Sequence, residues 1–453
     1  MKQTSLMMML LVMLGVSVAA HAQEEPPMPP FSKDDRVLIF APHPDDESIG
    51  CAGVIQQALA AGADVRVCYF TNGDHNELSF VVYEKKVPLF SKGFIKMGEL
   101  RRKEATLAME YLQVGKDRLT FLSYPDWGTM RIMMEYWETD APFMSLLTRI
   151  KAVPYPEALS YGAPYVGESV LGDITRVIAG FRPTKVFVSH PVDANRDHRA
   201  LYLFVTVAIW DLEGRIAAPA IFPYIVHVPR WPQPRGYHPR SPLTPPYVIG
   251  KIGWRRTNLG WLEVRAKRKA IRYYRSQIEY EPSYLISFAR RNELFGGYPD
   301  IDLRDGAASE SWQDVRAAEE IGVEATKEDA AKKNISALAY QRRGGDLYIR
   351  FTIRNPVDEA FGVNIHLLGY RKGTPFARMP KVRISVNGLR MEFRDKKRRI
   401  RAAGAKYHTQ GKDHYLRVPL AALGNPDRIL ASMSTFLGGL DLDETAWRVL
   451  VVE

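Results

Sequence analysis

The feature that most constrains the fold is a regular alternation of short apolar runs and helix-period patterns between residue 36 and about residue 208. The apolar runs span 36–42, 64–70, 118–124 and 184–189, and the helical patterns span 50–61, 94–113, 171–180 and 198–212. Strands that alternate with helices in this way form a mainly parallel sheet with helices on both faces. We therefore expect a Rossmann-like α/β fold whose ligand site lies at the carboxyl ends of its strands.

The pattern changes to that of antiparallel strands after Tyr298. A polar, helix-prone stretch at 309–333 leads into period-two runs, the clearest being Leu347 to Ile353, and further runs lie at 361–370, 382–386, 414–420, 428–435 and 447–452. About six or seven short strands in such a segment are typical of an antiparallel β-sandwich. The predicted organisation is a signal peptide at 1–22, an α/β domain at 33–298, a linker at 299–335 and a C-terminal β-sandwich at 336–453.

The first 22 residues have the pattern of a secretory signal peptide. Lys2 precedes an apolar run from Leu6 to Val18, and Ala20-His21-Ala22 supplies a small-x-small cleavage site. No later segment reaches the ~20 continuous apolar residues that a membrane span needs. We expect an exported protein, periplasmic or secreted, without a stable membrane span.

Composition narrows the class of protein further. A chain of 453 residues with 46% hydrophobic and 25% charged residues is too apolar for a disordered protein. The net charge of +11 does not in itself indicate nucleic acid, and the densest basic run, Arg394 to Arg401, is expected to be a solvated hairpin tip. We predict no nucleic-acid partner. Cys51 and Cys68 are either a disulfide pair or two buried small side chains, and no Cys/His zinc spacing is present.

Two polar clusters follow the ends of predicted strands. His43 and Asp46 lie three residues apart after the first strand, so an imidazole and a carboxylate can converge on one ion. The segment from Ser189 to His198 follows the fourth strand and can complete a site of two histidines and one carboxylate. A catalytic zinc takes three protein ligands and one open position, and this mixture of donors suits zinc, although iron or nickel also accept it.

These motifs resemble those of the PIG-L or LmbE-like zinc-dependent N-deacetylases, a family that includes N-acetylglucosaminyl-phosphatidylinositol de-N-acetylase. The resemblance rests on His43-Pro44-Asp45-Asp46-Glu47 and on Asp197-His198, with weaker echoes at 69–73, 101–105 and 125–126. It implies that His43, Asp46 and His198 hold Zn²⁺ and that Asp45 is the general base. Zinc lowers the pKa of a bound water toward ~7, which suits hydrolysis of an amide. Glu47 is assigned no chemistry.

The chain departs from this family at one position. Many members read His-x-Asp-His, where this chain reads Asn195-Arg196-Asp197-His198. Asn195 can bind substrate by donating a hydrogen bond to an oxyanion, but it cannot deliver a proton at neutral pH. His227, on a predicted strand at 223–228, is either a substitute catalytic acid or a structural histidine.

Other polar residues are expected around this site. His190, Asp193 and Asp197 are predicted to orient the metal ligands from behind them. Asp126 is predicted to contact substrate, as is Arg101, for which a surface ion pair is the alternative. The aromatic-rich stretch 126–166 has no clear period and is a candidate wall of the substrate site.

The sequence therefore predicts an exported zinc-dependent hydrolase that removes N-acetyl groups from an amino sugar, glycan or glycoconjugate; the sugar follows from the resemblance. Two alternatives stay open. One is an amidase with the same metal chemistry and a non-carbohydrate substrate. The other is a catalytically degenerate glycan-binding protein in which the β-sandwich does the work. Oligomeric state and the role of the sandwich are left open.

Overall fold

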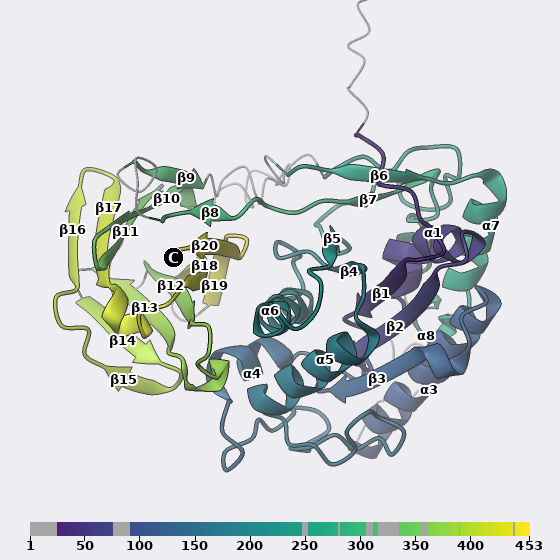
Figure 1. The fold of residues 1–453 in the computed structure, drawn as a ribbon, viewed down its shortest axis with the longest axis horizontal. Coiled ribbons are helices and arrows are strands. Elements are labelled where there is room, and N and C mark those ends of the chain that lie inside the picture. The colour runs from purple at the N-terminus through teal and green to yellow at the C-terminus, as the bar shows by residue number, and fades with distance from the viewer. Residues whose placement is uncertain are drawn as a thin grey trace, which may run out of the picture.

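The computed structural model describes residues 25–75, 91–246, 252–279, 281–304, 311–315, 335–354, 361–388, 390–437 and 440–453. The predicted signal peptide and most of the predicted linker lie outside these residues. Two units lie side by side in Figure 1, an α/β unit in purple to teal and a β-rich unit in green to yellow.

The α/β unit is built on a five-stranded parallel sheet in the order β3-β2-β1-β4-β5. Its strands are β1 (Arg36–Ala41), β2 (Asp64–Thr71), β3 (Leu119–Tyr124), β4 (Lys185–Ser189) and β5 (Ala220–Tyr224). The predicted α/β fold class is confirmed. One boundary was wrong: the fifth strand ends at Tyr224, so His227 follows the strand instead of lying on it.

Helices connect these strands and close the unit. They are α1 (Asp46–Ala60), α3 (Ser91–Tyr111), α4 (Thr129–Glu135), α5 (Gly167–Phe181), α6 (Arg196–Asp211), α7 (Trp261–Ile271), α8 (Arg275–Ile278) and α9 (Pro282–Ile286). A 3-10 turn lies at Lys116–Arg118, and β6 (Arg255–Asn258) pairs with β7 (Asn292–Phe295) in a separate two-stranded sheet. Helix α1 starts four residues before the predicted start, because Asp46 and Glu47 occupy its first turn, where the helix dipole favours acidic side chains.

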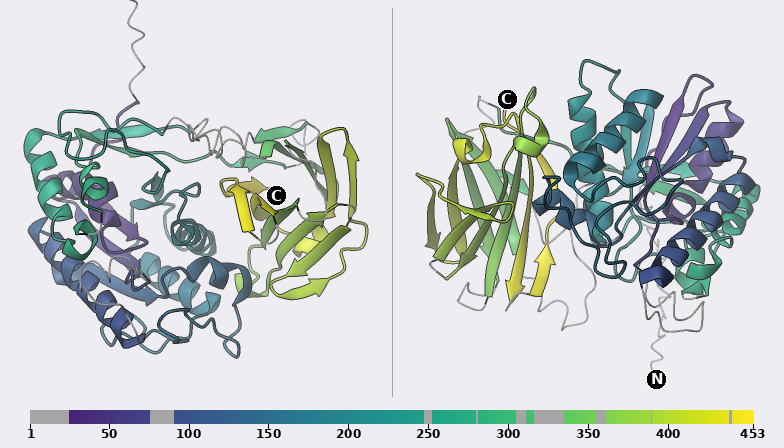
Figure 2. Two further views of the ribbon diagram at one scale, coloured as in Figure 1. Left: turned by 180° about the vertical axis from the view of Figure 1, so that it is seen from behind. Right: turned by 90° about the horizontal axis from the view of Figure 1, so that it is seen from below.

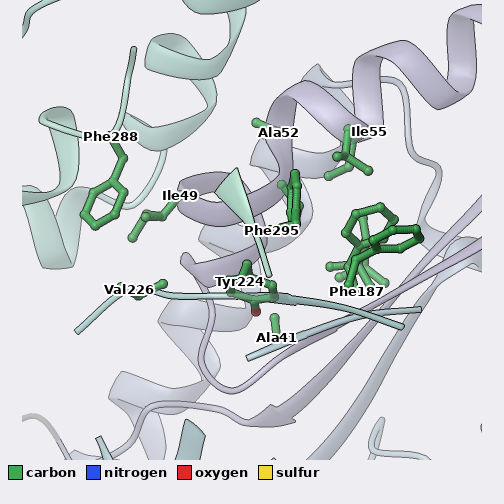
Figure 3. Close-up of a cluster of buried hydrophobic side chains, with 14 of the residues drawn as sticks. Ala41, Ile49, Ala52, Ile55, Phe187, Tyr224, Val226, Phe288 and Phe295 are labelled. Carbon is green, nitrogen blue, oxygen red and sulfur yellow. The ribbon is translucent and has the colours of Figure 1, made fainter. Parts of the chain in front are cut away.

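One face of the sheet is covered by α1, α3 and α7. Val37 and Ile39 of β1 point to this face and pack against Ile49 and Ile55 of α1, in a cluster that includes Ala108 of α3 and Ala270 of α7. Figure 3 shows the Phe187, Tyr224 and Phe295 rings close to α1. This layer comes entirely from the α/β unit apart from a contribution by Ala446.

The other face is covered by α4, α5 and α6. Leu38 and Phe40 of β1 point to it, because successive side chains of a strand alternate between faces. The same buried cluster continues into the β-rich unit, whose members are Leu368, Tyr370, Phe376, Met379, Leu430, Trp447 and Val449. The Trp137 and Phe376 rings meet edge to face at 5.2 Å, and the Trp210 and Tyr370 rings lie 5.0 Å apart. Figures 1 and 2 show α4 and α6 on the side of the α/β unit that faces the β-rich unit.

The β-rich unit consists of two sheets around its own apolar core. The larger sheet contains β8 (Ile301–Asp302), β12 (Phe361–Tyr370), β13 (Lys381–Asn387), β14 (Arg390–Asp395), β15 (Arg398–Ile400), β18 (Arg428–Leu437), β19 (Leu440–Glu444) and β20 (Arg448–Val451). The smaller contains β9 (Gln313–Val315), β10 (Ile335–Arg343), β11 (Asp346–Ile353), β16 (Lys406–Gln410) and β17 (Asp413–Pro419), and 3-10 turns lie at Phe376–Arg378 and Leu420–Leu423. Pairing is antiparallel except between β8 and β20, so the predicted antiparallel β-rich second unit is confirmed. The basic run 394–401 forms the hairpin of β14 and β15.

The two cysteines are free and buried, and they lie on opposite faces of the parallel sheet. Cys51 of α1 belongs to the cluster around Ile39, and Cys68 of β2 belongs to the cluster around Phe40. Among the residues that the structure describes, no helix combines the length and the apolar character of a membrane span.

Candidate metal centre and active site

The predicted site residues meet at the carboxyl edge of the parallel sheet. His43 follows β1, Asp126 follows β3, His190 to Asn195 follow β4, and His227 follows β5. Asp46 opens α1 and His198 lies in the first turn of α6. Parallel strands bring these segments together although they span more than 180 residues of sequence.

His43, Asp46 and His198 converge on one point. His43 Nδ1 lies 3.2 Å from Asp46 Oδ2, and His198 Nε2 lies 3.1 Å from the same oxygen. Tetrahedral ligands about 2.0–2.1 Å from zinc lie about 3.3 Å from one another, so the separations suit a shared ion. His198 is fully buried and neither of its ring nitrogens has a hydrogen-bond partner among the described residues, which is compatible with Nε2 binding a metal. The three residues therefore fit a zinc-type ion with an open coordination position.

The second nitrogen of each histidine faces a carboxylate. His43 Nε2 lies 3.2 Å from Asp126 Oδ1 and 3.6 Å from Asp197 Oδ2, and His198 Nδ1 lies 3.2 Å from Asp193 Oδ2. Carboxylates in this position orient an imidazole and make it a better ligand.

Two further groupings of carboxylates and histidines overlap this one. In these groupings, N–H donors already bind Asp193 and Asp197, whereas Asp126 Oδ1 accepts no hydrogen bond among the described residues and faces His43 Nε2. Asp193 accepts from the backbone N–H of Asn195, Val226 and His227 at 2.9–3.0 Å. Asp197 accepts from the backbone of Trp127 at 2.6 Å and from Thr129. These saturated carboxylates are better suited to holding the histidines than to binding an ion.

Asp45 sits at a strained turn directly beside the ligands. Its φ of 133° lies in the left-handed region, which costs free energy and is found preferentially at functional sites. Arg101 holds the turn: its Nη2 donates to Pro44 O at 2.9 Å and lies 3.2 Å from Asp45 Oδ2, while its Nη1 donates to Gly73 O at 3.0 Å. A Cβ at Gly73 would lie 2.0 Å from Arg101 Nη1, so only glycine leaves room for the guanidinium.

Glu47 supports the same turn from behind. Its Oε2 accepts the backbone N–H of Asp45 at 3.1 Å, and its Oε1 accepts from Ser48 Oγ at 2.9 Å and from Tyr274. Its carboxyl group is completely buried, and this burial raises its pKa to about 7. Glu47 therefore holds the backbone of the Asp45 turn in place.

Burial and neighbouring charges shift the pKa values of the central groups in opposite directions. Burial raises the pKa of Asp45 to about 8, against the opposing charge of Arg101. For Asp46, the two histidines outweigh burial and hold the pKa well below its usual range. For His198, the carboxylates of Asp193 and Asp46 outweigh burial and raise the pKa to about 9. The site thus has an excess of carboxylates around its histidines, a charge pattern that a divalent cation neutralises.

The remaining predicted residues are placed as follows. His227 is half-buried; its Nδ1 lies 3.1 Å from Asp193 Oδ1 and its ring lies 4.5 Å from that of His198. Asn195 caps α6, with its Oδ1 accepting the backbone N–H of Asp197 at 2.8 Å. His190 is buried, and burial lowers its pKa to about 3; its Nδ1 accepts the backbone N–H of Val192 at 3.1 Å. It stacks on Trp254.

The substrate contacts predicted for Arg101 and Asp126 stay predictions. Both side chains are buried, and their contacts in the structure are to the protein itself: Arg101 to the turn at Asp45, and Asp126 to His43 and to the backbone N–H of His75 at 3.0 Å.

Sequence reasoning missed the supporting groups. Asp74, which accepts from Tyr155 at 2.7 Å, and Thr129, which donates to Asp197, were not singled out, nor was Tyr274. Asp74 and Thr129 each follow a strand of the sheet within about five residues, and that position was the available signal. Tyr274 lies in a segment more than 220 residues from Glu47, so only the fold reveals its role.

Comparisons with known proteins match part of the α/β unit to one family. Residues 38–209 match the family model described as PIG-L: GlcNAc-PI de-N-acetylase, which confirms the predicted resemblance. A 1D-myo-inositol 2-acetamido-2-deoxy-alpha-D-glucopyranoside deacetylase of Mycobacterium avium (strain 104) is 40% identical over 86 residues, 19% of this chain and 28% of the relative. The corresponding enzyme of Rhodococcus jostii (strain RHA1) is 35% identical over 83 residues, 18% of this chain and 27% of the relative. The matches thus span less than a third of these curated relatives.

Among solved structures, the N,N'-diacetylchitobiose deacetylase from Pyrococcus horikoshii is 20% identical and aligns with a TM-score of 0.36, covering 58% of this chain and 84% of that chain.

Proposed function

We propose that this chain, whose residues 38–209 form a domain of the PIG-L family, is a metal-dependent hydrolase that removes N-acetyl groups from an amino sugar or glycoconjugate. The observation that supports the proposal most strongly is the convergence of His43, Asp46 and His198, with the Asp45 carboxyl group held beside them by Arg101. A bound Zn²⁺ would supply a Lewis acid that polarises the amide carbonyl and lowers the pKa of the attacking water.

Asp45 is the proposed general base. Arg101 fixes its carboxylate on one side, and Glu47 fixes its backbone N–H on the other. A base held in this way accepts the proton of the attacking water without first having to reorient.

His227 is the proposed proton donor to the leaving amine. Asp193 fixes its Nδ1, which leaves Nε2 for the substrate, and the side chain keeps 35% of its surface exposed. Asp193 thereby orients His227 and His198 together. This arrangement supplies the acid that Asn195 cannot provide.

Asn195 is the proposed donor to the developing oxyanion of the acetyl carbonyl. Its Oδ1 is used by the cap of α6, so the substrate would meet its side-chain NH₂ group.

We also propose that the protein is exported. The support is the apolar run of residues 6–18 with its small-x-small site, which lies outside the described residues. Detection of the protein in a periplasmic or culture fraction with a new N-terminus after residue 22 would support this, and a cytoplasmic protein that retains residue 1 would refute it.

The test of the activity is acetate release from N-acetylated amino sugars by the zinc-loaded protein. Asp45→Asn should lower kcat by about 10²–10⁴-fold with zinc still bound, because asparagine tolerates positive φ but accepts no proton. Asp34→Asn makes the same chemical change at an exposed position and serves as the control. Undiminished kcat in Asp45→Asn would exclude Asp45 as the base. If the zinc-loaded wild type releases no acetate from any N-acetylated sugar, the proposed activity is wrong.

A further inference from the structure

A groove runs between the α/β unit and the outer face of the larger sheet of the β-rich unit. Its volume is about 390 Å³, within the usual range of small-molecule sites. Its α/β side is formed by the segment from Trp127 to Glu135 and by Arg196, and its other side by residues of β12, β13, β18 and their neighbours, chiefly Asn364, His366, Arg383, Ser434 and Trp447. We call it the interdomain groove.

One wall of the groove is formed by segments that also contact residues of the candidate metal site. The backbone N–H of Trp127 donates to Asp197 Oδ2 at 2.6 Å, and that oxygen lies 3.6 Å from His43 Nε2. Arg196, the neighbour of Asp197 in sequence, reaches across to Asp441 of β19. The segments that hold the metal ligands therefore continue as one wall of the groove.

The groove combines an exposed aromatic surface with buried polar groups that have no hydrogen-bond partner among the residues that the structure describes. The Trp127 side chain is 56% exposed, and Met130 and Met134 lie along the same wall. On the opposite wall Trp447 is only 2% exposed, yet its Nε1 has no hydrogen-bond partner among the described residues. The buried Nδ1 of His366 also has no hydrogen-bond partner among the described residues. The His366 ring stacks on that of Trp447, with 5.9 Å between the ring centroids.

The sheet face supplies more polar groups at regular spacing. Asn364 pairs in register with Ser434, and His366 with Arg383, so these side chains form a patch on one face of the sheet. Arg383 Nε also lacks a hydrogen-bond partner among the described residues. Buried donors without partners are costly, so a site that carries several is suited to a ligand rich in acceptors.

We propose that the interdomain groove binds the sugar residues that adjoin the N-acetylated residue in a glycan chain, so that the β-rich unit completes the substrate site. The inference rests on the proposed function. A sugar ring offers an apolar face to an indole and hydroxyl oxygens to planar donors, which is the combination that Trp127, Arg383 and Trp447 present.

The test is the dependence of affinity on chain length. Full-length, zinc-loaded Asp45→Asn protein, in which turnover is slowed, is titrated by calorimetry with N-acetylglucosamine and its linear dimer, trimer and tetramer. Affinity should increase at least about tenfold from monomer to tetramer, equivalent to about 1.4 kcal/mol. Arg383→Ala and Trp447→Phe, each in the Asp45→Asn background, should remove most of this increase. Arg390→Ala on β14, outside the groove lining, is the matched control.

The outcomes separate this inference from the proposed function. Equal affinity for all chain lengths, no binding, or a chain-length increase that survives both groove substitutions in folded protein would overturn the groove assignment, whatever the wild type hydrolyses. If the increase depends on Arg383 but the wild type releases no acetate, the groove binds glycan and the proposed activity fails. Trp447→Phe keeps an aromatic ring, and its circular dichroism and melting temperature check that it folds.

Discussion

The two faces of the parallel sheet are covered in different ways. On the side of Val37 and Ile39, helices α1, α3 and α7 form a layer that belongs almost wholly to the α/β unit. On the side of Leu38 and Phe40, helices α4 to α6 form a layer whose buried cluster extends into the β-rich unit. One face thus carries a self-contained core, whereas the other shares its core with the second unit.

The candidate metal site lies where the two layers meet. Asp46 is supplied by the start of α1 from the first layer, and His198 by the start of α6 from the second. A shared ion would therefore link a self-contained layer to one that depends on the β-rich unit. The β-rich unit packs against α6, and α6 carries His198. The second unit is thereby linked to the candidate metal site.

The largest effect is expected when the proposed metal ligand on α6, His198, is removed. His198→Ala leaves two protein ligands, so metal content should fall from one per chain to none, and acetate release should fall on the order of 10⁴-fold. Mass spectrometry of the metal and an acetate assay measure the two effects. His408→Ala, an exposed histidine of β16, is the control. One metal per chain in His198→Ala would show that His198 is not a ligand.

The shared core predicts joint unfolding of the two units. Trp137→Ala removes the ring that meets Phe376 and should lower the free energy of unfolding by about 3–5 kcal/mol. Because the cluster is shared, calorimetry should show one transition that moves as a whole. Phe295→Ala makes a similar cavity in the self-contained layer and should cost a similar amount. Two separate transitions, with that of the β-rich unit unmoved by Trp137→Ala, would contradict the shared core.

Removal of the metal tests the link between the layers. A ligand present at 100 times its Kd stabilises the folded state by about 2.7 kcal/mol, so a chelator should lower the melting temperature of the wild type. The same chelator should leave His198→Ala unchanged. An identical shift in both proteins would mean that the chelator acts elsewhere.

A smaller effect is expected from the contact that connects the β-rich unit to the metal loop. Glu444 Oε2 lies 2.7 Å from Arg199 Nη1, and Arg199 Nε donates to the carbonyl of Asp193. Glu444→Gln weakens this contact and should lower zinc affinity several-fold, less than the 10–100-fold typical of groups that touch a ligand directly. Glu392→Gln in the hairpin of β14 makes the same change away from the loop. Equal zinc affinity in the two variants would show that the contact between Glu444 and Arg199 does not influence the metal loop.

The smallest expected effect is a pH dependence of stability. Burial lowers the pKa of His366 to about 4, with Arg383 and Arg196 adding to the shift and Glu444 and Asp441 opposing it. Between pH 6.5 and about 4 the unfolded chain therefore binds a proton that the folded chain does not, so the free energy of unfolding should fall as the pH falls through this window. Denaturation of His366→Gln at several pH values should show a shallower fall than the wild type. If the free energy of unfolding falls equally with pH in the variant and the wild type, His366 does not contribute to the pH dependence.

Sequence patterns predicted most strands and helices of the parallel sheet and the proximity of His43, Asp46 and His198, but they did not reveal the shared core. Runs such as Phe361–Tyr370 alternate regularly and were located to the residue, because a half-buried strand leaves a period-two pattern. Helix α4 was missed because its seven residues lie in an aromatic stretch whose burial depends on the second unit.

At the site, proximity to strand ends predicted that His43, Asp46 and His198 lie close together, as they do in the structure, but not what their neighbours do. Arg101 was predicted to face substrate, and its contacts in the structure are to the turn of Asp45, because the loop at Gly73 accepts its guanidinium. Such contacts join segments that have no regular spacing in sequence, so no local pattern encodes them.

The placement of Cys51 and Cys68 on opposite faces of the sheet has a consequence for folding in an oxidising medium. The native chain keeps the two thiols apart and buried, whereas an unfolded chain can close them into a short covalent ring that the native sheet cannot accommodate. Oxidation before folding would therefore produce a trapped species, and folding before oxidation would protect both thiols. Refolding yield should rise with a thiol reductant and become independent of it once either cysteine is replaced by alanine.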